Sequence, residues 1–167
     1  IGSFVRSEVR SLRDAAEEQI PPEREIARLR AEVRNLDQDH VKVVKQLARV
    51  QVEQGESRER VAVLEKRKTE VTEVMRARET AVRAAEAKAK AGEVNVSVVL
   101  GDTSVSLDAG RARLKDVVQT YLDVDATLTR TRAKLESQGR IAEQLEKQRA
   151  AFGRLKADLD AAIDSLE

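Results

Sequence analysis

The chain contains few aromatic residues and no cysteine. Its 167 residues include two Phe, one Tyr and no Trp, fewer than a layered globular domain of this length normally uses. The lack of cysteine excludes a disulfide framework and a thiolate metal site. The sequence also has no run of about 18 or more apolar residues, the length that a membrane-spanning helix needs.

Charged residues are abundant, but neither sign dominates. They make up 37% of the chain, and 31 basic and 30 acidic side chains leave a formal net charge of +1. This balance provides no global field to attract nucleic acid, so we expect no nucleic-acid partner. The first residues lack the apolar core of a secretory signal, which predicts a cytoplasmic protein. Because the chain begins at Ile1 rather than Met, we expect residues before it to be missing or removed.

Apolar residues recur at alternating spacings of three and four over two long stretches. The first extends from Ile26 to Ala89 and the second from Leu107 to Leu166, each in a single heptad phase. Heptads sustained over this length predict coiled-coil helices. Gly55 lies inside the first stretch. The phase continues through it, and a helical glycine costs only about 1 kcal/mol, so we expect one continuous helix there.

Proline and glycine mark the ends of the first long helix. Pro21-Pro22 closes an amphipathic helix that we expect over residues 1–20, and proline fits the first position of the helix that follows. Lysines in the last turn and Gly92 just beyond are typical of a helix C-terminus. These signals predict a long helix over residues 22–91.

A different periodicity appears over residues 92–107. Apolar residues, mostly valine, alternate with Asn, Ser and Thr on both sides of Gly101-Asp102, which predicts a β-hairpin with a two-residue turn. Asp108 is a suitable N-cap for a second long helix over residues 108–167. We therefore predict an all-α fold: a long antiparallel coiled-coil helical hairpin, with an N-terminal amphipathic helix and a small β-hairpin at its tip.

The turn also predicts which residues of the two long helices lie opposite each other. A reversal near Gly101-Asp102 pairs Leu36 with Ile163, Leu47 with Phe152, Leu64 with Leu135, Lys68 with Thr131, and Arg78 with Tyr121. A shift of seven residues satisfies the same heptad phase.

Several heptad core positions are polar, and they have two interpretations. A two-helix core leaves its edges wet, so long cationic side chains are tolerated there. Alternatively, polar core residues specify the register or loosen the hairpin during assembly. The positions are Gln54, Ser57, Lys68, Arg78, Gln138, Arg149 and Lys156.

The sequence offers little for catalysis. The single histidine, His40, occupies a heptad core position, and the nearest acids, Asp37 and Asp39, are ordinary helix-surface residues. This placement favours a structural or register-setting role. We find no nucleophile–base arrangement, phosphate-binding glycine loop or Glu-x-x-His pair. We therefore predict a protein that is not an enzyme, with no cofactor and no metal.

The N-terminal helix combines an apolar stripe with basic residues on its other faces. This pattern suits a helix that lies among anionic lipid headgroups. Packing on the coiled coil of this chain or a neighbouring subunit remains an equal alternative. The predicted membrane-binding residues are Ile1, Phe4, Val5, Arg6, Val9, Arg10, Leu12 and Arg13.

The predicted β-hairpin is also a candidate contact site, because an isolated hairpin is marginally stable in water. It could pair edge to edge with a neighbouring hairpin. It could also enter a membrane, as the tongue of a helical pore-forming toxin does. The residues predicted to form this assembly tip are Val96, Val98, Val99, Leu100 and Val105.

A short motif at the start of the chain suggests a family. Gly2, Phe4 and Arg6 form a Gly-x-Phe-x-Arg pattern, and a long helical hairpin rich in Ala, Glu, Arg and Leu follows. Between them lies an acidic, proline-bearing junction, formed by Glu17, Glu18, Pro21, Pro22 and Glu23. In this order, the elements resemble those of the bacterial ESCRT-III superfamily, which includes phage-shock protein A and the vesicle-inducing protein of plastids.

The resemblance implies a self-assembling scaffold that remodels or protects membrane. Its hairpins would overlap into rods, rings or filaments, and its partners would be further copies of the chain and anionic membrane lipids. It would be cytoplasmic and peripherally associated with the inner face of a membrane. The alternative is a structural coiled-coil or adaptor protein without a membrane role.

Overall fold

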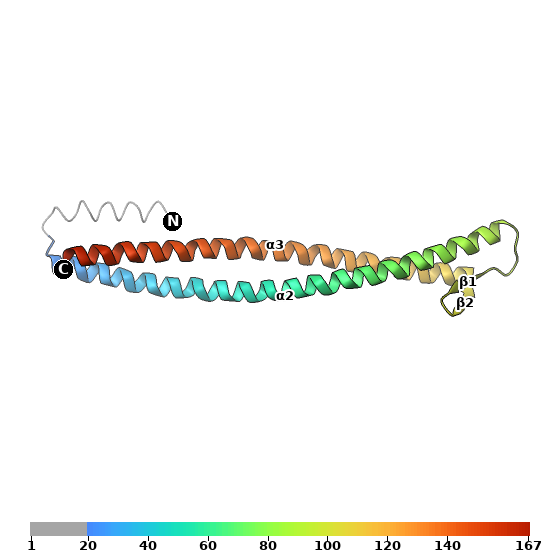
Figure 1. Cartoon of the computed structure of the whole chain (residues 1–167), viewed down its shortest axis with the longest axis horizontal. Coiled ribbons are helices and arrows are strands. Elements are labelled where there is room, and N and C mark those ends of the chain that lie inside the picture. The colour runs from blue at the N-terminus through green and yellow to red at the C-terminus, as the bar shows by residue number, and fades with distance from the viewer. Residues whose placement is uncertain (1–19) are drawn as a thin grey trace. The chain divides into compact units, whose positions relative to one another are not determined.

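The computed structural model describes residues 20–167, so the predicted N-terminal helix lies outside the described residues except for Ile20. The elements in chain order are α2 (Pro22–Lys90), β1 (Ser97–Leu100), β2 (Thr103–Ser106) and α3 (Leu107–Leu166) (Figure 1). The predicted combination of two long helices and a small antiparallel sheet is confirmed.

Helix α2 begins at the proline pair and is continuous. The carbonyl oxygen of Pro21 accepts hydrogen bonds from the amides of Arg24 and Glu25, at 2.9 and 3.3 Å. Pro22 is therefore the first helical residue, a position where the missing amide hydrogen costs nothing. The helix passes through Gly55 without a break, which confirms the prediction of one continuous helix.

The C-terminal end of α2 is a Schellman motif. Gly92 has a φ of +90°, which a glycine adopts without strain. Its amide donates to the carbonyl of Ala89 at 3.1 Å, and the amide of Glu93 donates to the carbonyl of Lys88 at 3.2 Å. These bonds satisfy carbonyl groups that the end of the helix would otherwise leave unpaired.

Helix α3 starts one residue earlier than predicted, and its cap is a different residue. The hydroxyl of Ser106 accepts a hydrogen bond from the amide of Ala109 at 3.2 Å. Ser106 is therefore the N-cap, and Leu107 is the first helical residue. Asp108 lies within the first turn, where its charge suits the positive end of the helix dipole. The prediction that Asp108 caps the helix was wrong.

The strands form a two-residue hairpin around Gly101-Asp102. Leu100 pairs with Thr103 and Val98 with Val105. Gly101 has a φ of +64°, and glycine at the first turn position with positive φ is characteristic of a type II′ turn. The predicted turn is thus confirmed, although β1 begins only at Ser97. We call Ser97–Ser106 the strand hairpin.

The chain divides into two compact units. The terminal unit contains the residues up to Val50 and Ile141–Glu167, and the strand unit contains Gln51–Arg140. Each unit includes one segment of α2 and one segment of α3, and each has its own core.

In the terminal unit, α2 and α3 bury two small apolar clusters between them. Leu29 packs with Leu159 and Ile163 in one cluster. The second cluster contains Val43, Leu47 and Leu145, with Phe152 packed against it. As residue numbers rise in α2 they fall in α3, so the two segments run antiparallel.

In the strand unit, the core extends from the helices to the strand hairpin. Val82 and Ala85 of α2 form a buried cluster with Val98 of β1, and Leu107 and Leu114 of α3 pack against it. In both units, the heptad positions are buried or half-buried, except Ala89 in α2 and Arg149 in α3. Arg149 was predicted at a core position but is exposed.

The register differs from the predicted one by about seven residues. Leu47 shares its cluster with Leu145, seven residues before the expected partner Phe152, which lies at the edge of the cluster. In the strand unit, the strand hairpin packs beside Val82 and Ala85 of α2.

Two predicted cation positions change with the register. Lys68, expected beside Thr131, instead forms an ion pair with Asp125 at 2.6 Å. Arg78, expected beside Tyr121, donates a hydrogen bond to the backbone carbonyl of Arg113 at 2.8 Å. In the observed register, each cation therefore has an oxygen partner on the opposite helix.

Candidate functional site

The two faces of the strand hairpin have different surroundings. Val98 is 0% exposed and packs with Val82 and Ala85. Val99, the next residue of β1, is 64% exposed. Successive strand residues point to opposite faces, so one face of the sheet is seated on the helices and the other is open.

This seating separates the residues that were predicted to form an assembly tip. Val98 is part of the buried cluster, and Val96, Leu100 and Val105 pack against it. Only Val99 is well exposed. Period-two alternation identified the strands, but it did not indicate which face the helices cover, because both faces of β1 carry valine.

Gly110 allows the strand hairpin to approach α3 closely. A Cβ atom at Gly110 would lie 2.6 Å from Cγ2 and 2.9 Å from Cβ of Val98. Such distances are too short for carbon atoms in contact, so any larger residue displaces the valine. No sequence signal distinguishes this glycine from Gly153, where nothing lies within 4 Å of the Cβ position.

Among residues 20–167, the backbone groups on the outer edge of β1 have no strand partner. The sheet contains two strands, so β1 is paired on one side only. The pairs next to a two-residue turn alternate between hydrogen-bonded and non-bonded types. Leu100–Thr103 and Val98–Val105 are accordingly the pairs joined by backbone hydrogen bonds. Ser97 and Val99 belong to the non-bonded pairs, so their amide and carbonyl groups point away from β2.

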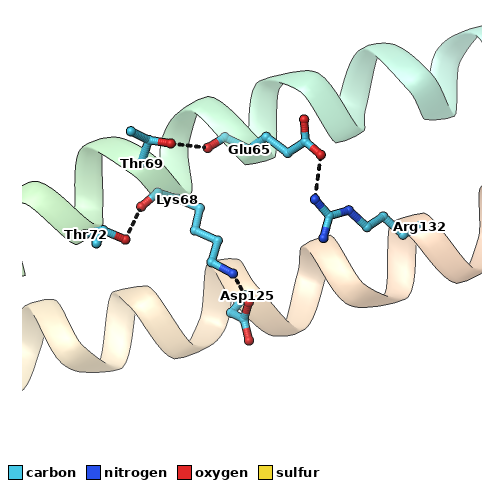
Figure 2. Close-up of polar contacts among 6 residues, drawn as sticks. All are labelled: Glu65, Lys68, Thr69, Thr72, Asp125 and Arg132. Atoms are coloured by element: carbon cyan, nitrogen blue, oxygen red, sulfur yellow. Dashed lines mark hydrogen bonds and ion pairs between the residues drawn. The ribbon is translucent and has the colours of Figure 1, made fainter.

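Ion pairs connect α2 and α3 within the strand unit. Figure 2 shows Lys68 next to Asp125 and Glu65 next to Arg132, each pair at 2.6 Å. The ammonium group of Lys68 also lies 5.6 Å from the centre of the Tyr121 ring, within the range of a cation–π contact. These contacts place charged groups of opposite sign along the helix–helix seam.

Two of the seam lysines have altered acid–base properties. The hydrogen bond to Asp125 raises the pKa of Lys68 above its ordinary value. In the terminal unit, Asp37 lies 2.7 Å from Lys156, and this hydrogen bond raises the pKa of Lys156. In both cases the carboxylate stabilises the charged ammonium form.

A polar layer is buried in the strand unit. Ser57 and Gln138 are buried, and Gln54 lies close to Gly139, its Nε2 atom 3.6 Å from the Cβ position of that glycine. Neither amide atom of Gln138 has a hydrogen-bond partner among the described residues. An unpaired buried amide costs free energy, so this layer is a weak part of the seam.

His40 has an apolar neighbour and a nearby ion pair. Its ring lies 6.4 Å from that of Phe152, tilted by 54°. Leu36, Asp37, Gly153 and Lys156 line the same shallow pocket, and Asp37 is paired with Lys156. His40 therefore lies in the seam between α2 and α3, and its structural role stays a prediction.

The described part of the chain contains no cluster of potential metal ligands. Within residues 20–167, no three His, Asp or Glu side chains are grouped as metal ligands. Neither α2 nor α3 contains a stretch with the length and hydropathy of a membrane span. The predicted membrane-binding residues, from Ile1 to Arg13, lie outside the described residues. The candidate site is therefore the strand hairpin, together with the outer surface of the helices.

Comparison with known proteins does not assign the chain to a family. No protein-family model, curated protein or solved structure matches it.

Proposed function

We propose that this chain is a self-assembling, membrane-associated scaffold of the ESCRT-III-like class. In this proposal, α2 and α3 form a long antiparallel coiled-coil hairpin that overlaps with further copies, and the segment 1–20 docks the polymer on anionic membrane. The assembly would bend or protect the membrane rather than catalyse a reaction.

The observation that carries the proposal is the pairing of two very long helices. Helix α2 has 69 residues and α3 has 60, and the contacts between them are antiparallel in both units. Among the described residues, many positions of both helices are exposed. Exposed valines on α2, such as Val52 and Val63, provide apolar contact points for neighbouring copies.

The sequence of the segment 1–20 supports the membrane role. Val5 and Val9 belong to an apolar stripe that has Phe4 at its edge, and Arg6 and Arg10 lie on other faces of the expected helix. Apolar burial and attraction to anionic lipid each contribute to interfacial binding. The two contributions can therefore be tested by separate substitutions.

Liposome co-sedimentation tests the membrane role. Deletion of residues 1–20 should abolish binding to anionic liposomes without loss of helicity. The pair Arg6→Glu and Arg10→Glu should weaken binding, because each change replaces an attractive charge with a repulsive one. The pair Lys45→Glu and Arg49→Glu, at exposed positions of α2, is the charge-matched control. Equal binding by the truncated and full chains would exclude the proposed membrane role of this segment.

The second candidate function is a structural coiled-coil or adaptor protein. It is favoured by the same long helices, because they bury apolar clusters against each other. Negative-stain microscopy distinguishes the two: polymers that coat liposomes support the scaffold, and discrete particles that are indifferent to lipid support the adaptor.

A further inference from the structure

The outer edge of β1 is suited to a specific contact between two copies of the chain. We propose that β1 pairs antiparallel with β1 of a second copy of this chain, so that two strand hairpins form one four-stranded sheet. The proposal rests on the self-assembly part of the proposed function and names the contact that would start it.

The backbone provides the first argument. The amide and carbonyl groups of Ser97 and Val99 point away from β2, as described above. Around a two-fold axis, Ser97 of one copy lies opposite Val99 of the other. Each residue then donates one hydrogen bond and accepts one, which is the regular antiparallel pattern. The same surface serves both copies, as a closed two-fold contact requires.

The charge pattern provides the second argument, because it allows two identical edges to meet. Charged residues form 37% of the chain, yet Asp102 is the only one between Val94 and Leu107. Two identical charged edges would repel each other, whereas these neutral edges meet without repulsion. Exposed edge strands are usually protected by lysine, proline or a bulge, and β1 contains neither lysine nor proline.

The side chains provide the third argument. Val99 is 64% exposed, although a β-branched residue in a strand gains from cross-strand neighbours. Pairing of the two β1 strands would bring the Val99 side chains of both copies onto one face, diagonally next to each other. The opposite face of each hairpin is already occupied by Val82 and Ala85, so the pairing requires no change in either core.

The edge of β2 is less suitable. β2 continues directly into α3, and the hydroxyl of Ser106 is used as the N-cap of that helix. A strand that approached this edge would meet the start of the helix. β1 is instead preceded by a non-helical segment after Gly92.

Val99→Pro is a selective test. The amide of Val99 points away from β2, so proline removes only the outward donor and leaves the bonded pairs of the strand hairpin in place. Sedimentation velocity of the full chain should show a concentration-dependent dimer or larger species for the natural sequence. Val99→Pro and Val99→Lys should each raise the half-dissociation concentration about tenfold or more. Val94→Lys, which places the same charge on an 85% exposed valine outside the strand, is the control and should have no such effect.

Hydrogen exchange at Val98 and Leu100 should remain slow in Val99→Pro, because these amides lie in the bonded pairs. If association is equally strong in Val99→Pro, Val99→Lys and the natural chain, the β1 contact is wrong, while assembly through the helices still stands. If the natural chain is monomeric at all concentrations, both the β1 contact and self-assembly fail. Liposome binding is a separate measurement. Its dependence on residues 1–20 tests the membrane role and does not test the β1 contact.

Discussion

At the scale of single residues, Gly110 determines how closely the strand hairpin packs on α3. Its missing side chain provides the space that Val98 fills, and Val98 is fully buried there. Glycine normally weakens a helix, so its presence in the first turns of α3 has a cost that this contact offsets. The position is important because it joins the sheet to the helices.

Gly110→Ala is expected to destabilise the chain. The new Cβ atom would overlap the side chain of Val98, and overpacking of this kind costs about 1–3 kcal/mol. Chemical denaturation should show a lower free energy of unfolding, and hydrogen exchange should become faster in the strand hairpin. Gly153→Ala in the same helix is the matched control, because nothing lies within 4 Å of its Cβ position. A Gly110→Ala chain as stable as Gly153→Ala would contradict the close contact.

At the scale of elements, the ends of α2 and the turn of the strand hairpin were predictable from local chemistry. Proline suits the first helical position because its φ is fixed near the helical value and no amide hydrogen is needed there. Gly92 and Gly101 have positive φ values that other residues rarely adopt. The cap of α3 was harder to predict. Ser106 and Asp108 are both good N-cap residues, and only the end of β2 decides between them.

Replacing glycine with alanine should have opposite effects on stability at Gly55, which lies inside α2, and at Gly92, which follows it. Gly55 lies in a continuous helix, and nothing lies within 4 Å of its Cβ position. Gly55→Ala should therefore raise the free energy of unfolding by about 1 kcal/mol. Gly92→Ala should lower it, because alanine at a φ of +90° is strained. Thermal melts followed by circular dichroism would test both, and a lower melting temperature for Gly55→Ala would indicate a turn instead of a helix.

At the scale of the whole molecule, the heptads predicted which faces of the helices are buried but not their register. A seven-residue shift leaves every apolar residue on the seam, so hydrophobic burial alone does not select one pairing. Within the strand unit, the packing of the strand hairpin and pairs such as Lys68–Asp125 distinguish the observed pairing from the alternative. Nothing in the sequence marks Asp125 as the partner of Lys68. It indicates the register only once that pairing is known.

These seam pairs predict a loss of stability at alkaline pH. The pKa values of Lys68 and Lys156 are raised above 10.5 in the folded chain. Folding therefore favours their protonated forms. Their contribution is complete below the pKa of the unfolded chain, near 10.5, and is lost as the pH rises through the higher folded values.

Melting temperatures measured from about pH 8 to pH 12 would test this linkage. The pair Lys68→Gln and Lys156→Gln should lower the melting temperature at pH 8, and the difference from the natural chain should shrink toward pH 12. The pair Lys42→Gln and Lys147→Gln is the control, because it removes two lysines whose ion pairs lie within a single helix. Since one seam lysine lies in each unit, single substitutions would show which unit contributes. A difference between the natural and Lys68/Lys156 chains that stays constant with pH would mean that these pairs do not stabilise the register through charge.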